Sequence, residues 1–131
     1  MNKKIRINNK VQDSVHVHGD RNMIDLIIRN LLSNAIKFTP AGSISISVKE
    51  IDNQVRVEVA DQGIGIPEEA LPNLFTRFYR AQTAVERGIA GTGLGLYMVK
   101  QNVENYNGKI VVKSTQDEGA TFTVSFPVYH E

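Results

Sequence analysis

The arrangement of hydrophobic and polar residues divides the chain into segments of two kinds. From Asp20 to about Phe38 the hydrophobic residues recur at the spacing of one helix face, and they are Ile24, Ile27, Ile28, Leu31, Leu32 and Ala35. Asp20 precedes this pattern as a candidate N-cap, and Pro40 and Gly42 interrupt it. We therefore predict one long amphipathic helix over this segment.

Elsewhere the hydrophobic residues alternate with polar ones, which is the period of a half-buried strand. Residues 43–51 and 54–61 alternate on either side of Asp52–Asn53, and this pattern predicts a β-hairpin. Two shorter alternating runs near the start of the chain predict strands at Ile5–Ile7 and Val15–Val17.

The last third of the chain repeats both patterns. A second helix is predicted from about Leu94 to Tyr106 and is ended by Asn107–Gly108. Residues 109–115 and 120–127 then form a second predicted hairpin through Asp117–Gly119. Because strands and helices mix without strict βαβ alternation, we predict an α+β sandwich with helices on one face of a mostly antiparallel sheet.

Composition narrows the classes of function. The chain has 131 residues, of which 41% are hydrophobic and 22% charged, as in a single globular domain. A formal net charge of +1 creates no overall field for nucleic acid or an anionic membrane. The sequence has no cysteine, no apolar stretch long enough to span a bilayer and no signal-peptide pattern. These features are compatible with a cytosolic domain and exclude disulfides within it.

Two glycine-rich loops are the first candidates for a ligand site. One is "DQGIGIP", which begins at Asp61, and the other is "GTGLGL", which begins at Gly91. The second loop does not fit GxxxxGK[ST], because Leu94 and Gly95 follow Gly93. It does not fit GxGxxG either, because its spacing is GxGxG and it follows a polar segment rather than a strand. These glycines indicate either backbone amides available to an anion at a helix start or an ordinary loop boundary.

A polar face of the first predicted helix is a second candidate. It lies opposite the hydrophobic stripe and comprises Asn30, Asn34, Lys37 and Phe38. Asparagine is a mediocre residue for a helix interior, so this face is either a polar site or a solvated surface. Asp61, where a strand ends beside glycines, either accepts a hydrogen bond from a ligand amine or forms a turn.

The order of these segments resembles a known family. In sequence, "NLLSNAIKF", "DQGIGIP", "LFTRFYR" and "GTGLGL" are similar to the N, G1, F and G2 boxes of the ATP-binding domain of sensor histidine kinases. That domain belongs to the superfamily of gyrase, Hsp90, histidine kinase and MutL proteins. The resemblance spans nearly the whole chain. It implies the Bergerat α/β sandwich, with a mixed, mostly antiparallel sheet of about five strands and about three helices on one face.

The resemblance implies a catalytic role for the polar face of the first helix. Asn34 would coordinate a Mg²⁺ ion that bridges the phosphates of ATP, and Asn30 would help to set the environment of the metal or the phosphates. Such an assignment agrees with the preference of Mg²⁺ for few protein oxygens when phosphates and waters supply the rest. Lys37 would contact a phosphate oxygen, and Phe38 would lie against the adenine or its surrounding wall.

The resemblance assigns the adenine base to the first glycine loop. Asp61 would accept a hydrogen bond from the exocyclic amine of adenine, while guanine would present a carbonyl to it. Gly63 and Gly65 would let the backbone pass close to the base, and Ile66 would supply an apolar wall. Two further residues, Ala120 and Thr121, are expected near the base.

The segment between the F and G2 boxes would be the ATP lid, from 80 to 91. Phe75 and Phe78 would anchor its base, and the candidate phosphate contacts are Arg77, Arg80 and Arg87. The G2 box would place backbone amides on the phosphates as the second helix begins. Its ATP-binding residues are expected to be Gly91, Thr92, Gly93, Leu94 and Gly95.

One position favours the histidine kinase branch of the superfamily. The ATP-hydrolysing branches and the serine-kinase branch carry a glutamate general base four residues before the metal asparagine, and here that residue is Asn30. A histidine acceptor needs less help, because neutral imidazole can attack phosphorus directly. The alternatives are a serine kinase or ATPase of the same fold, and a docking module that has lost nucleotide binding.

The acceptor histidine is expected on another domain. His16 and His18 lie in a predicted strand and His130 lies at the end of the sequence, so none resembles an acceptor on a helical hairpin. We expect residues 1–131 to be one catalytic domain that binds Mg·ATP and phosphorylates a separate dimerisation and phosphotransfer domain. A response regulator would be an indirect partner, nucleic acid would not be one, and the isolated domain would be monomeric. Gln62 and Ala90 depart from the family pattern.

Overall fold

The structure is a computed structural model that describes residues 4–11, 21–80, 85 and 95–127. Its strands are β1 (Lys4–Val11), β2 (Ala41–Ile51), β3 (Gln54–Asp61), β4 (Lys109–Thr115) and β5 (Gly119–Pro127). Its helices are α1 (Arg21–Phe38), the short 3-10 helix η1 (Glu68–Asn73) and α3 (Gly95–Asn105). The predicted strand at Val15–Val17 and the predicted N-cap Asp20 lie outside the described residues.

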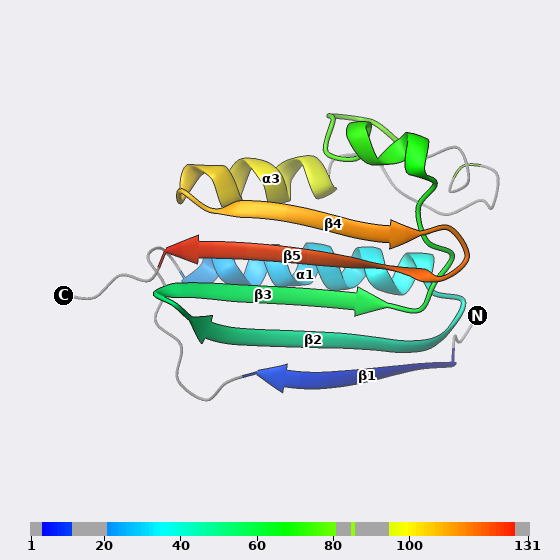
Figure 1. Ribbon diagram of the computed structural model, residues 1–131, viewed down its shortest axis with the longest axis horizontal. Helices are drawn as coiled ribbons and strands as arrows, with labels where there is room; N and C mark the ends of the chain where they lie inside the picture. Colours follow the sequence, from blue (N-terminus) through cyan, green and yellow to red (C-terminus); the bar gives the residue numbers. More distant parts are fainter. Residues whose placement is uncertain (1–3, 12–20, 81–84, 86–94, 128–131) are drawn as a thin grey trace.

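The strands form one five-stranded sheet in the order β1-β2-β3-β5-β4 (Figure 1). β1 pairs with β2 in parallel, and the other three pairs are antiparallel. Antiparallel neighbours can be joined by short turns, whereas a parallel pair needs a crossover, and α1 lies in the connection between β1 and β2. The α+β class and the mixed, mostly antiparallel sheet are therefore confirmed.

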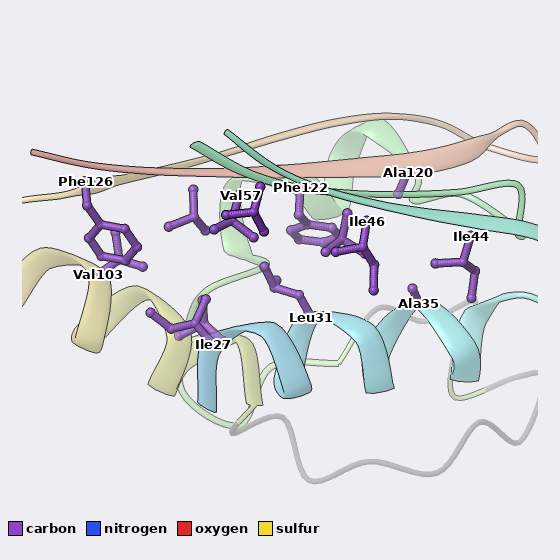
Figure 2. Close-up of a cluster of buried hydrophobic side chains, with 14 of the residues drawn as sticks. Ile27, Leu31, Ala35, Ile44, Ile46, Val57, Val103, Ala120, Phe122 and Phe126 are labelled. Carbon is purple, nitrogen blue, oxygen red and sulfur yellow. The ribbon is translucent and has the colours of Figure 1, made fainter. Parts of the chain in front are cut away.

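The helices pack on one face of this sheet, where alternate strand residues point inward (Figure 2). The core contains Ile27, Leu31 and Ala35 of α1, Val99 and Val103 of α3, and Ala70 of η1. The sheet contributes Ile44, Ile46, Val48, Val55, Val57, Val59, Ala120, Phe122, Val124 and Phe126. Burial of these side chains is the main source of stability, and it aligns α1 and α3 side by side beneath the sheet.

Two turns confirm the predicted element boundaries. Asp52 and Asn53 have φ values of 50° and 63°, the pattern of a two-residue type I′ hairpin turn. At the end of α3, Gly108 N–H donates to the carbonyl of Val103 at 2.8 Å while Asn107 adopts a φ of 60°. This is the Schellman arrangement expected where a helix stops.

No helix in the described part of the chain is long and apolar enough to cross a membrane.

Candidate functional site

The centre of the candidate site is the carboxylate of Asp61 at the end of β3. The alternation of β3 that buries Val57 and Val59 also turns Asp61 toward the helices, where its side chain is 9% exposed. Oδ1 accepts hydrogen bonds from the backbone N–H groups of Gly63, at 2.9 Å, and Ala120, at 3.2 Å. Both bonds use the same oxygen, so within the described residues Oδ2 accepts no hydrogen bond and is available to a ligand donor.

The surroundings of Asp61 make its carboxylate a strong acceptor. Burial raises the pKa of the Asp61 carboxyl above its ordinary value of 3.8, and the two backbone hydrogen bonds offset part of this increase. A buried acceptor without a hydrogen-bond partner costs free energy, and a ligand N–H group that donates to it removes this cost. The geometry therefore suits a ligand that presents one hydrogen-bond donor to the end of β3.

The glycine loop after Asp61 is held between α1 and the β4–β5 hairpin. Ile64 N–H donates to the carbonyl of Phe38 at 3.0 Å, and the carbonyl of Ile64 accepts from Asp117 N–H at 2.6 Å. Ile66 is buried, and its N–H donates to Ser114 Oγ at 2.8 Å. Three backbone groups of the loop thus bond to elements distant in sequence, which fixes the loop relative to Asp61.

The two glycines of this loop are required by contacts with the protein's own backbone. A Cβ atom on Gly63 would lie 2.1 Å from the carbonyl oxygen of Phe38. One on Gly65 would lie 2.1 Å from the carbonyl oxygen of Thr115, and Gly65 also has a φ of +70°. The atoms that exclude a side chain at these two positions belong to the neighbouring elements, and the expected approach of a base to this loop stays a prediction.

The polar face of α1 meets the start of α3. Asn30, Asn34 and Phe38 are half-buried, and Lys37 is exposed. A Cβ atom on Gly95, the first residue of α3, would lie 3.9 Å from Asn30 Oδ1, so this amide side chain faces the helix N-terminus. Unpaired N–H groups and the helix dipole favour anions at such a terminus. Two of the four motifs found in the sequence therefore meet at this point.

The described residues contain no group of three or more His, Cys, Asp or Glu side chains that could hold a metal ion. Asn34 offers an amide oxygen, which fits Mg²⁺ where the phosphates of a nucleotide and water supply the other ligands.

Several predicted site residues lie outside the described residues. They are Arg87 and the first part of the G2 box, namely Gly91, Thr92, Gly93 and Leu94. Of the expected lid at 80–91, only Arg80 and Val85 are described, and Arg80 is half-buried. The three histidines His16, His18 and His130 are likewise outside the described residues.

The F box separates into a packed and an exposed aromatic residue. The Phe75 ring meets Phe122 edge-on at a centroid distance of 6.3 Å, and Lys100 Nζ lies 5.9 Å from its centroid. Phe78 is 60% exposed, with the Arg77 guanidinium 4.9 Å from its ring centroid. Its backbone has a φ of +65°, a conformation that large side chains rarely adopt. Among the described contacts, Phe75 is thus the packed anchor of this segment.

Two residues of the site were missed or undervalued in the sequence. Gln62 N–H donates to the carbonyl of Ser43 at 3.2 Å, and Gln62 Oε1 accepts from Ser43 N–H at 3.1 Å, so this departure from the family pattern extends the β2–β3 pairing. Ser114 bonds to the Asp61 loop from β4. By strand alternation Ser114 lies on the same side of β4 as Ile110 and Val112, which pack against the core. A polar residue on that side was the signal in the sequence that could have identified it.

This arrangement can be compared with known proteins. A family model described as histidine kinase-, DNA gyrase B- and HSP90-like ATPase matches residues 19–130, which include both α1 and the Asp61 loop. The chain belongs to this ATPase family. This membership agrees with the N, G1 and F boxes in the sequence and with the five-stranded sheet of the structure.

Two proteins with similar sequences are named histidine kinases. The chain is 39% identical over 129 residues to the sensor-like histidine kinase SenX3 of Mycolicibacterium smegmatis, covering 98% of this chain and 34% of that protein. It is 40% identical over 124 residues to the circadian input-output histidine kinase CikA of Synechococcus elongatus, covering 94% of this chain and 16% of that protein. The chain thus spans about a third or less of these relatives.

Solved structures of histidine kinases share the fold. The mycobacterial sensor histidine kinase MprB superposes with a TM-score of 0.82 at 29% identity, over 97% of this chain and 86% of that one. The nucleotide-free catalytic domain of histidine kinase ThkA gives 0.79 at 30% identity, over 95% and 80% of the two chains. Full-length ShkA in complex with AMPPNP gives 0.81 at 30% identity, over 97% of this chain and 26% of that one. The ATPase fold here is therefore that of histidine kinase catalytic domains.

Proposed function

We propose that this domain binds Mg·ATP and transfers the γ-phosphoryl group to a histidine on a separate phosphotransfer domain in two-component signalling. The observation that carries the proposal is the Asp61 carboxylate, which is buried at the end of β3 and bonded through Oδ1 to Gly63 and Ala120. A fixed acceptor whose second oxygen has no partner among the described residues is suited to recognition of the adenine amino group. The complex of the similar protein ShkA with AMPPNP supports the choice of an adenine nucleotide.

Asp61 would also exclude guanine nucleotides. Guanine presents a carbonyl where adenine presents an amine, so two acceptors would face each other in a buried place. An unsatisfied buried acceptor costs about 1–3 kcal/mol, which corresponds to a roughly 5- to 150-fold preference for ATP over GTP. One carboxylate held by two backbone N–H groups is sufficient for this discrimination.

The phosphates would lie between the polar face of α1 and the start of α3. Asn34 would hold Mg²⁺ together with phosphate oxygens and water, Asn30 would contribute its amide beside Gly95, and Lys37 would supply a positive charge. When bound, Mg²⁺ would neutralise the charge of the phosphate oxygens around the transferred group. The protein's own part would be positioning and electrostatic stabilisation, which are the main demands of phosphoryl transfer.

A histidine acceptor is favoured by the side chain at position 30. The Asn30 amide cannot accept a proton as a general base, whereas a water or serine nucleophile needs one. Neutral imidazole needs no general base to attack phosphorus. In agreement with a histidine acceptor, the relatives SenX3 and CikA are named histidine kinases. A phosphotransfer domain and, through it, a response regulator would be the partners. We place the domain in the cytoplasm, within a larger sensor kinase, as a monomer that binds no nucleic acid.

Nucleotide binding can be tested by thermal stabilisation. Mg·ATP at 100 times its Kd should stabilise the folded domain by about 2.7 kcal/mol, and GTP should do so much less. Asn34→Ala and Asp61→Ala should abolish the rise in melting temperature. Ser47→Ala is the matched control, because Ser47 lies on the open face of the sheet, opposite the face on which the described helices pack. This variant should retain the rise in melting temperature. Absence of stabilisation of the unsubstituted chain at millimolar Mg·ATP would favour the docking-module alternative.

Transfer can be tested with radioactive ATP. The isolated domain should not label itself, but it should label an added phosphotransfer domain from the same parent protein, and the label should be lost in acid, as phosphohistidine is. Acid-stable label on serine, or steady phosphate release by the domain alone, would contradict the histidine assignment and support the serine kinase or ATPase alternative.

A further inference from the structure

We propose that Ser114 is a positioning residue for Asp61 that acts through the peptide group joining Gly119 to Ala120. Ser114 does not need to touch the nucleotide for this role. The inference rests on the proposed function of Asp61 as the acceptor of the adenine amino group. It assigns a part in base recognition to a residue of β4, far from the four motifs in the sequence.

The geometry links three groups in series. Ser114 Oγ donates to the carbonyl oxygen of Gly119 at 2.7 Å. The same peptide group carries the N–H of Ala120, which donates to Asp61 Oδ1 at 3.2 Å. A peptide that accepts at its carbonyl is polarised, so its N–H becomes a better donor. Ser114 therefore both holds this peptide in place and strengthens its bond to the carboxylate.

The direction of the hydroxyl proton follows from its partners. The carbonyl of Gly119 can only accept, and Ile66 N–H, which lies 2.8 Å from Ser114 Oγ, can only donate. The single hydroxyl proton must therefore point at Gly119, and a lone pair must face Ile66. Threonine could satisfy both partners in the same way, and alanine could satisfy neither.

Ser114 also joins the two segments that converge on Asp61. Ile66 belongs to the loop whose Gly63 N–H is the first donor to Oδ1, and Gly119 precedes the second donor, Ala120. Gly119 packs closely against the end of β3, because a Cβ atom on Gly119 would lie 2.1 Å from the carbonyl oxygen of Asp61. One hydroxyl thus sets the separation of the two donors that orient the carboxylate.

The prediction is a selective loss of recognition at the adenine amino group. Ser114→Ala should weaken ATP binding about tenfold, equal to about 1.4 kcal/mol, because Asp61 is no longer aimed at its donor. Binding of purine riboside 5′-triphosphate, which lacks the amino group, should change by less than about twofold. A merely structural defect would weaken both nucleotides equally. Isothermal titration calorimetry with Mg²⁺ present measures both affinities.

Three variants complete the design. Ser114→Thr keeps the hydroxyl and should keep the preference for ATP, while Ser47→Ala on the open face should leave both affinities unchanged. If Ser114→Ala does not fold, Ser114→Cys offers a weak donor of similar size and should give a smaller loss in the same direction. Equal losses for both nucleotides, or no loss for ATP, would overturn the role of Ser114.

A nucleotide-free measurement separates this inference from the proposed function. In Ser114→Ala the bond from Ala120 N–H weakens, so the pKa of Asp61 should rise above that of the unsubstituted chain. The ¹³C shift of the Asp61 carboxyl followed through a pH titration reports this change. If the unsubstituted chain binds no ATP, the proposed function fails, yet a raised pKa still supports the link through the peptide. An unchanged pKa overturns it.

Discussion

Substitution of Gly63 by alanine tests whether the Asp61 loop is held by backbone contact with α1. The added Cβ atom would lie 2.1 Å from the Phe38 carbonyl oxygen and 2.9 Å from Thr39 Oγ1. Real Cβ atoms are essentially never closer than 3.0 Å to such neighbours, so the loop must move by at least the difference, 0.9 Å. Thr39 is fully buried and cannot withdraw into solvent.

The displacement breaks one hydrogen bond and distorts a second. Ile64 N–H and the Phe38 carbonyl, now 3.0 Å apart, would be drawn out of hydrogen-bond range, and the bond from Gly63 N–H to Asp61 Oδ1 would be distorted. Loss of the neutral backbone bond and weakening of the charge-assisted one cost about 2–4 kcal/mol together in a buried place. For a domain of this size that lowers the melting temperature by roughly 10 °C.

Gly95→Ala is the control for Gly63→Ala. A Cβ atom on Gly95 would find its nearest neighbour, Asn30 Oδ1, at the ordinary contact distance of 3.9 Å, and alanine suits a helix. Its free energy of unfolding should equal or slightly exceed that of the unsubstituted chain in urea titrations. If Gly63→Ala proved as stable as Gly95→Ala, the contact between the loop and α1 would not be what holds Asp61.

Two further predictions concern charge and packing. Because burial raises the pKa of Asp61 above 3.8, the folded chain binds this proton more tightly than the unfolded chain, so the stabilising contribution is present below pH 3.8 and is lost as the pH rises through the folded pKa. Asp61→Asn should therefore gain stability relative to the unsubstituted chain as the pH rises above about 4 in urea titrations, and a difference independent of pH would contradict the assignment. Phe126 is fully buried, so Phe126→Ala should cost about 3–5 kcal/mol by the same assay. Val111→Ala, at a side chain 52% exposed, should cost less than about 0.5 kcal/mol, and similar costs for the two would refute the inward and outward assignment of the strands.

The elements and their boundaries were largely predictable because they depend on local patterns. The spacing of Ile27, Leu31 and Ala35 predicted α1, and the two-residue turn at Asp52–Asn53 predicted the hairpin of β2 and β3. Periodicity and turn chemistry act between near neighbours, so a single sequence reports them. The pairing of β5 between β3 and β4 is not local, and no pattern in the sequence specified that order.

The candidate site was predictable as a set of motifs and less so as a set of contacts. Motif order predicted ligand-binding roles for Asn34, Asp61 and the glycines of the Asp61 loop, and these roles stay predictions. The structure shows that Gly63 and Gly65 are pressed against the backbones of Phe38 and Thr115. Such close approaches join residues far apart in the chain, so they are settled only when the elements pack.

The sequence by itself determined where helices and strands form, which faces are hydrophobic, and to which ATPase family the chain belongs. Only the tertiary structure decided that Asp61 accepts a hydrogen bond from Ala120, a residue 59 positions away. It also decided that Ser114 donates to the carbonyl of Gly119, in the peptide group that carries the Ala120 N–H. The physical reason is that hydrophobic periodicity depends only on residues that are near one another in the sequence. A hydrogen bond between β3 and β5 exists only after the core has brought the two strands into register.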